Sequence, residues 1–98
     1  MSYPRELNQW AQDLLRRLEI GDTEVNIDRV LDMSAAVAHG IVRPAAPVTS
    51  YILGYVVGIA EATGQAPYQI AFDSGLKVIE RALENWVAEH GAAEQDGQ

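Results

Sequence analysis

The 98-residue sequence predicts an all-α fold, a single-domain four-helix bundle over residues 1–90. Apolar residues recur at spacings of three and four in four segments, which is the period of an amphipathic helix. Glycine or proline separates these segments, and none of them shows the apolar–polar alternation of a β-strand. A chain of this length can bury one modest core. The acidic tail over residues 91–98 has nothing to bury and is expected to be disordered.

The first two helices are expected over residues 4–19 and 27–42. Gly21 is a C-terminal signal for the first helix, and Asn26 is the expected N-cap of the second. Pro44 ends the second helix, because the residue before a proline avoids the helical region. The apolar stripe of the first helix consists of Leu7, Trp10, Leu14 and Leu18.

The third and fourth helices are expected over residues 47–63 and 67–90. Pro47 suits the first turn of the third helix, and Gly64 closes it. The connection to the second helix is short, so these two helices should be neighbours. Gly75 marks either a kink or a close contact in the fourth helix. The seam of that helix consists of Phe72, Leu76, Ile79, Leu83 and Trp86.

The composition excludes several classes of function. There is no cysteine, so thiolate chemistry and disulfides are impossible, and two histidines cannot form a histidine-rich metal site. Fourteen acidic against seven basic residues give a net charge of −7, which opposes nucleic-acid binding. The most apolar window, Val48 to Ala60, has about 13 residues against the roughly 20 that span a bilayer. We therefore expect a cytoplasmic protein without cofactor or metal.

A stripe of small residues runs along the third helix: Ser50, Gly54, Gly58 and Ala62. Glycine costs about 1 kcal/mol relative to alanine inside a helix, so two glycines on one ridge need a reason. Close packing against another helix of the chain, with Ala36 and Gly40 as facing small residues, is the first interpretation. Self-association along the groove, or access for a ligand, are the others. Tyr51 and Tyr55 lie on an adjacent flank, and we expect buried rings with exposed hydroxyls.

A charged cluster lies on one face of the second helix: Asp28, Asp32, His39 and Arg43. A solvated face with weak ion pairs is one interpretation. His39 and Arg43 also suit the last helical turn, where cations meet the negative end of the dipole. Alternatively, His39 and Arg43 could hold an anion together with the exposed amides at the start of the third helix, near Val48 to Ser50. The spacing matches no established metal site and positions no nucleophile beside a base.

The string VLDMSAAVAHGIVRPAAPVTSYILGYVVG resembles a small, uncharacterised helical domain family of actinobacteria. Trp10 matches the tryptophan-bearing first helix of that family. Members are often labelled molybdopterin-guanine dinucleotide biosynthesis proteins, so the resemblance implies a link to molybdenum cofactor synthesis. The matching positions are Asp32, His39, Arg43, Pro44, Pro47 and Thr49. The Gly-rich phosphate loop of a nucleotidyltransferase is not found in the sequence, so the implied role is that of an accessory protein.

Two hypotheses of function follow from the sequence. The favoured hypothesis is a non-catalytic helical accessory or interaction domain that binds a protein partner, such as a nucleotidyltransferase, or a second copy of itself. The alternative is a domain that binds a small anion or nucleotide at the corner between the second and third helices. In that site His39 and Arg43 are the anchors. The candidate residues for binding either a ligand or a partner are Asp28, Asp32, His39, Arg43, Thr49 and Ser50.

Overall fold

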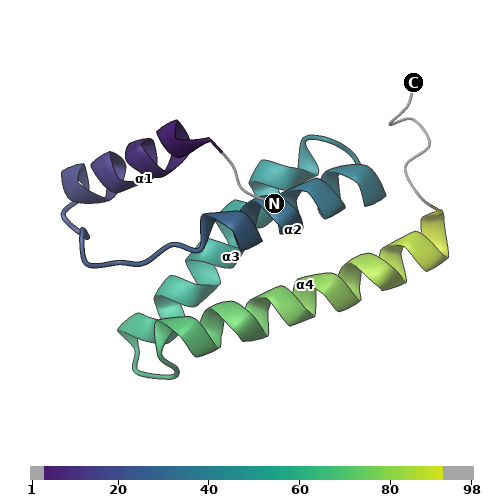
Figure 1. The fold of residues 1–98 in the computed structure, drawn as a ribbon. Helices are drawn as coiled ribbons and strands as arrows, with labels where there is room; N and C mark the ends of the chain where they lie inside the picture. The colour runs from purple at the N-terminus through teal and green to yellow at the C-terminus, as the bar shows by residue number, and fades with distance from the viewer. Residues whose placement is uncertain (1–3, 92–98) are drawn as a thin grey trace. The chain divides into compact units, whose positions relative to one another are not determined.

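The computed structural model describes residues 4–91 and is all-α over that range, which confirms the predicted fold class (Figure 1). The chain forms two compact units, Met1–Leu31 and Asp32–Gln98, with the boundary inside the second helix. Within the expected tail, residues 92–98 lie outside the described residues. The helices are α1 (Arg5–Arg17), α2 (Ile27–Gly40), α3 (Ala45–Ala62) and α4 (Tyr68–His90).

The first unit contains α1 and the linker that leads to α2. The α1 helix ends at Arg17, earlier than expected, and the left-handed residue that follows it is Glu19 with φ 63°, not Gly21. The amides of Glu19 and Ile20 donate to the carbonyls of Arg16 and Leu15, at 3.0 and 2.9 Å. These two bonds form a Schellman motif, which terminates the helix two residues before the glycine.

Asn26 caps α2 as the sequence predicts. Its side-chain oxygen accepts a hydrogen bond from the backbone amide of Arg29 at 3.2 Å, and its carbonyl accepts one from Val30 at 3.1 Å. The first of these bonds satisfies an amide that has no partner inside the helix. The cap therefore fixes where α2 begins.

The corner between α2 and α3 differs from the prediction at both ends. The α2 helix ends at Gly40 instead of residue 42, and α3 begins at Ala45 instead of residue 47. Pro44 adopts helical angles (φ −65°, ψ −12°) and serves as the N-cap of α3. Pro47 is consequently the third residue of α3, where a missing N–H costs little because that amide has no helical partner.

The second unit is built around α3 and α4, which are joined at residues 63–67 and diverge from that turn (Figure 1). As expected, Gly64 closes α3: it adopts φ 76°, and the amides of Gly64 and Gln65 return to the carbonyls of Glu61 and Ala60. The core consists of Met33, Val37, Leu53, Val57, Ala60, Ala71, Phe72 and Leu76.

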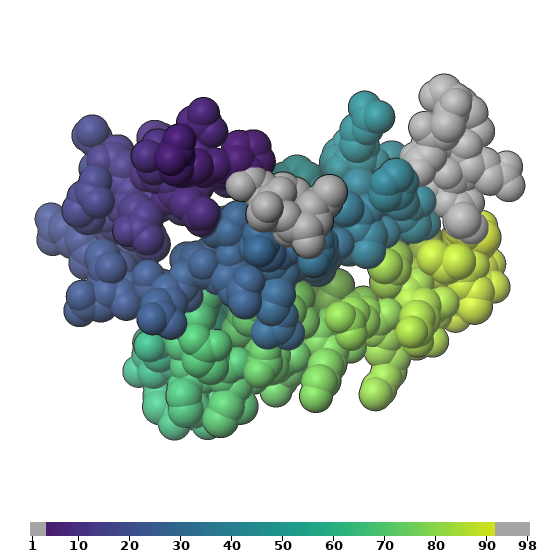
Figure 2. All heavy atoms as spheres, in the orientation of Figure 1, coloured from purple at the N-terminus to yellow at the C-terminus, as the bar shows by residue number. Residues whose placement is uncertain are grey.

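Two glycines permit the close approach of helices in this unit, and they are not the two on the α3 stripe. A Cβ atom at Gly75 would lie 2.6 Å from Leu53 Cδ1, so Gly75 is a close α3–α4 contact. A Cβ atom at Gly40 would lie 2.8 Å from Leu83 Cδ1, where α2 meets α4. Figure 2 shows the side chains of α2 (blue) directly beside those of α4 (green to yellow).

Candidate functional site: an apolar groove in the second unit

An apolar groove of about 390 Å³ lies among α2, α3 and α4 in the second unit. The α3 and α4 helices form its two walls, and the end of α2 with the following residue closes one side. We call this feature the apolar groove. Its lining consists of Val37, Ile41, Thr49, Ile52, Leu53, Val56, Gly75, Val78, Ile79, Ala82, Leu83 and Trp86.

The groove exists because the two walls diverge from their connecting turn. Near the turn, the α4 seam is buried: Phe72 and Leu76 are each only 4% exposed. Further along, Ile79 and Leu83 are half-buried, and Trp86 is 42% exposed. The predicted seam is therefore correct in its register, but only its first half is covered by the chain's own core.

Trp86 lines the far end of the groove, and its ring stacks on that of His90. The rings of Trp86 and His90 stack with centroids 3.9 Å apart, and His90 Nδ1 lies 3.1 Å from the carbonyl oxygen of Trp86. The two residues are one helical turn apart, so the stack forms within α4 beside the groove. The groove thus presents an aromatic side chain of the kind that contacts apolar partners.

The lining is almost wholly apolar, and Thr49 is its only polar residue. A site for a polar small molecule needs several converging polar groups to orient the ligand. A catalytic site needs a nucleophile, an acid or a base facing the substrate. This lining offers neither set, whereas an apolar helix face inserted into it would cover few polar groups, the Thr49 hydroxyl among them.

The corner proposed for anion binding lacks free amides at the start of α3. Of the four backbone positions 44–47 that could point an N–H at an anion, Pro44 and Pro47 have none. The amides of Ala45 and Ala46 donate to the carbonyls of Val42 and Arg43, at 3.0 and 3.1 Å. The first positions of α3 therefore offer no free N–H to an anion, and residues 48–50, whose amides are expected to face it, lie further inside the helix.

The side chains named for that corner lie in different surroundings. His39 and Arg43 are exposed at the end of α2 and in the following turn. Thr49 faces the apolar groove, and the hydroxyl of Ser50 lies 3.1 Å from that of Ser34 on α2, a partner that the sequence did not suggest. Ser50 thus helps to hold α3 against α2.

Asp28 and Asp32 are exposed on α2, as a solvated helix face would have them. Among residues 4–91, no three histidine or acidic side chains gather closely enough to hold a metal ion. The solvated-face interpretation of the charged cluster is thus the one that the exposure of its members favours.

The α3 stripe is open to solvent at its glycines. A Cβ atom added at Gly54 or Gly58 would meet no atom within 4 Å, so the interpretation that these glycines allow packing inside the chain is wrong. Ala62 is also exposed. Tyr51 and Tyr55 stack on each other at 6.5 Å and are 75% and 63% exposed, so the expectation that their rings are buried is wrong too.

The α3 helix also corrects the estimate of its apolar length. The uninterrupted helix has 18 residues with a mean hydropathy of 1.3, and by length and composition alone it could cross a membrane. Only 17% of that span is buried. An apolar helix with so little cover indicates that further surface on α3 is available for contact.

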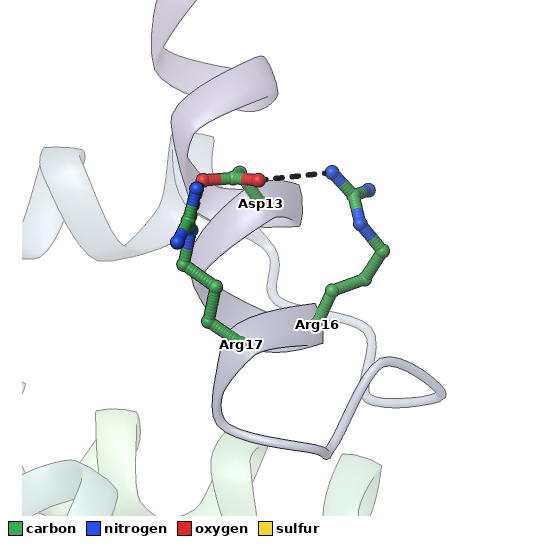
Figure 3. A network of polar contacts seen from close by, with 3 residues as sticks. All are labelled: Asp13, Arg16 and Arg17. Carbon is green, nitrogen blue, oxygen red and sulfur yellow. Dashed lines mark hydrogen bonds and ion pairs between the residues drawn. The ribbon is translucent and has the colours of Figure 1, made fainter.

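The polar network in the first unit is small and solvent-exposed (Figure 3). On α1, the carboxylate of Asp13 accepts hydrogen bonds from Arg16 Nη2 at 3.1 Å and from Arg17 Nε at 2.8 Å. Exposed pairs one turn apart contribute about 0.3–0.5 kcal/mol each. This network supports α1 and shows no sign of a binding site.

Sequence reasoning missed most of the groove-lining residues as functional candidates. The sequence predicts the α4 seam as core. The helical period identifies the apolar face of α4, but it does not say over what length of α4 another helix covers that face. The unusually low charge of α3, with Glu61 as its single charged residue, was the available signal.

The fold and the site define a small all-α domain with an apolar groove and no recognisable catalytic constellation in its described part. The chain belongs to the family described as Domain of unknown function (DUF6457), whose model matches residues 2–95. Neither a curated protein nor a solved structure matches the sequence. The resemblance inferred from the motifs is thus confirmed only at the level of a helical domain family of unknown function.

Proposed function

We propose that this protein is a non-catalytic interaction domain whose apolar groove receives an amphipathic helix of a partner protein. The observation that carries the proposal is the groove itself: about 390 Å³, lined by apolar side chains from three helices and walled by Trp86. Grooves of this kind bind helices through apolar residues at positions i, i+3, i+4 and i+7.

The net charge of the chain indicates the charge of the partner helix. The whole chain carries −7, and residues 32–91 hold six acidic against three basic side chains, a net charge of −3. The apolar lining provides affinity, and the net negative charge of residues 32–91 favours a helix with lysine or arginine beside its apolar face. The partner segment is therefore a basic amphipathic helix.

The resemblance to molybdopterin-guanine dinucleotide biosynthesis proteins suggests where to look for the partner. A nucleotidyltransferase of that pathway is the candidate that follows from it. The described part of this chain supplies no phosphate-binding loop, so its role in such a complex is to hold or position the enzyme.

Site-specific photocrosslinking tests the proposal. A photoreactive phenylalanine analogue is placed at Val78, which lines the groove and is 68% exposed, and in a matched variant at Ser74, an exposed α4 position that does not line the groove. We expect Val78 to crosslink reproducibly to one basic amphipathic segment, and Ser74 not to. Equal labelling at both positions, or a crosslinked segment without helical amphipathicity, contradicts the proposal.

A direct titration completes the test. A synthetic peptide of the crosslinked segment is added to a Trp10→Phe chain, in which Trp86 is the remaining tryptophan. Insertion into the groove should shift Trp86 fluorescence to shorter wavelength, and Val78→Asp should weaken peptide binding at least tenfold. A peptide that binds the Val78→Asp chain equally well binds elsewhere.

A further inference from the structure

A second surface on α3 lies outside the apolar groove and has no cover among the described residues. It consists of Val48, Tyr51, Gly54, Tyr55, Gly58 and Ile59, which we call the α3 face. At 100° per residue these positions occupy one continuous side of the helix, turned away from the buried Leu53 and Val57. None of them is charged.

We propose that the α3 face is the interface with a second copy of this chain, formed by two antiparallel α3 helices around a twofold axis. The face is self-complementary, which a twofold interface requires. It carries a ridge, the stacked Tyr51 and Tyr55, directly beside a hollow, the glycines at 54 and 58. With the axis between residues 54 and 55, Tyr51 of each copy lies over Gly58 of the other, and Tyr55 over Gly54.

The proposed dimer explains why α3 contains Gly54 and Gly58. Each lowers the helical stability of the single chain by about 1 kcal/mol relative to alanine, and neither relieves a contact within it. A tyrosine ring from a second copy needs a flat patch at those two positions, because a larger side chain would hold the helices apart. The close approach then occurs between chains.

The charges favour a second copy in the antiparallel sense. Two chains of net charge −7 repel each other, but Glu61 is the only charged residue of α3. A parallel pair would place the two Glu61 carboxylates side by side, whereas the antiparallel pair separates them to opposite ends. The same net charge opposes attachment of this face to an anionic membrane surface.

The area is sufficient for a weak but specific dimer. From the exposed fractions of its side chains, the α3 face amounts to roughly 600 Å² per copy. If the whole face is covered, the pair buries up to about 1,200 Å², the lower end of the range for specific interfaces. The dimer should therefore depend visibly on protein concentration.

Sedimentation analysis of the whole chain across a concentration series tests the proposal. We expect a monomer–dimer equilibrium, and Gly58→Leu should raise its dissociation constant at least tenfold. Because a Cβ at this position meets open space, Gly58→Leu should fold and melt at or above the wild-type temperature when dilute. Ser74→Leu, on exposed α4, is the matched control and should leave the equilibrium unchanged.

Disulfide formation between introduced cysteines tests whether the two α3 helices are antiparallel. The chain has no cysteine of its own, so only the introduced residues can pair. Tyr51→Cys and Gly58→Cys chains should form a mixed disulfide when combined and oxidised. Tyr51→Cys alone should not, since two copies of residue 51 lie about 10 Å apart along the axis of an antiparallel pair.

Three results overturn the proposal: a monomer at every concentration, a dimer indifferent to Gly58→Leu, or no mixed disulfide. Flotation with vesicles of phosphatidylcholine and phosphatidylglycerol that Gly58→Leu keeps or strengthens, in place of a dimer, would assign the face to a membrane instead. The groove variant Val78→Asp should leave the dimer intact, so failure here is distinguishable from failure of the proposed partner site.

Discussion

At the scale of single residues, four helical glycines divide by what surrounds them. Gly40 and Gly75 sit where another helix comes close, and a Cβ at either would overlap a leucine side chain. Gly54 and Gly58 face open space. Glycine therefore permits a close helix contact at two of these positions and relieves no contact at the other two. Substitution by alanine should distinguish the two cases.

Gly75→Ala and Gly54→Ala should change stability in opposite directions. Gly75→Ala forces Leu53, which is buried, to move, and overpacking outweighs the gain in helix propensity by about 1 kcal/mol. Gly54→Ala gains up to about 1 kcal/mol because nothing obstructs the methyl group. Urea unfolding of dilute protein measures both, and a loss of stability in Gly54→Ala would contradict the open environment of that residue.

Asn26→Ala should lower the stability of the start of α2. The variant loses the side-chain acceptor of the Arg29 amide, which costs about 1 kcal/mol at an N-cap. Asn26→Asp keeps an acceptor and adds a negative charge at the positive end of the helix dipole, so it should match the wild type. Hydrogen exchange at the Arg29 and Val30 amides reports the effect, and equal protection in all three proteins would exclude the cap.

At the scale of helices, α1 and α3 both end in a Schellman motif, but different residue types occupy the left-handed position of the two motifs. Gly64 adopts φ 76° without steric cost, whereas Glu19 adopts φ 63° with a side chain. The α1 helix therefore ends with a strained residue, and α3 ends with a relaxed one.

Glu19→Gly should stabilise the end of α1, and Gly64→Ala should destabilise the end of α3, each by about 1 kcal/mol. The exchange rates of the amides that close each motif, Ile20 and Gln65, provide the local measurement. Faster exchange of the Ile20 amide in Glu19→Gly would contradict the expected stabilisation of the end of α1.

Burial along α4 predicts a gradient of mutational cost. Phe72→Ala should cost about 3–5 kcal/mol, because Phe72 is buried in the core. Trp86→Ala removes a larger side chain from the open end of the groove and should cost much less, on the order of 1 kcal/mol. Thermal and urea unfolding compare the two variants, and equal costs would mean that the groove is closed in solution.

At the scale of the whole molecule, the groove and the α3 face share no residue, so they should operate independently. The double variant Val78→Asp with Gly58→Leu should lose partner binding and dimerisation by the sum of the two single effects. Sedimentation measures dimerisation and peptide titration measures partner binding, each on the wild type, the two single variants and the double variant. A Gly58→Leu chain that no longer binds the groove peptide would show that the two surfaces are coupled.

The sequence by itself determined the elements. The helical period, the cap at Asn26 and the closing glycine at residue 64 are local features, and local physics places them within a few residues. The α2–α3 boundary was less accurate, because prolines are tolerated at more than one position of a first turn. The left-handed Glu19 was missed since most non-glycine residues avoid that conformation.

Only the tertiary structure decided what the apolar residues cover. A period of 3.6 identifies the face of a helix that should be buried, but not whether another helix follows that face along its whole length. The α3 and α4 helices diverge from their turn, so one predicted seam becomes core at Phe72 and an open groove at Trp86. The direction of a neighbouring helix likewise decided that Gly75, and not Gly54, is the close contact.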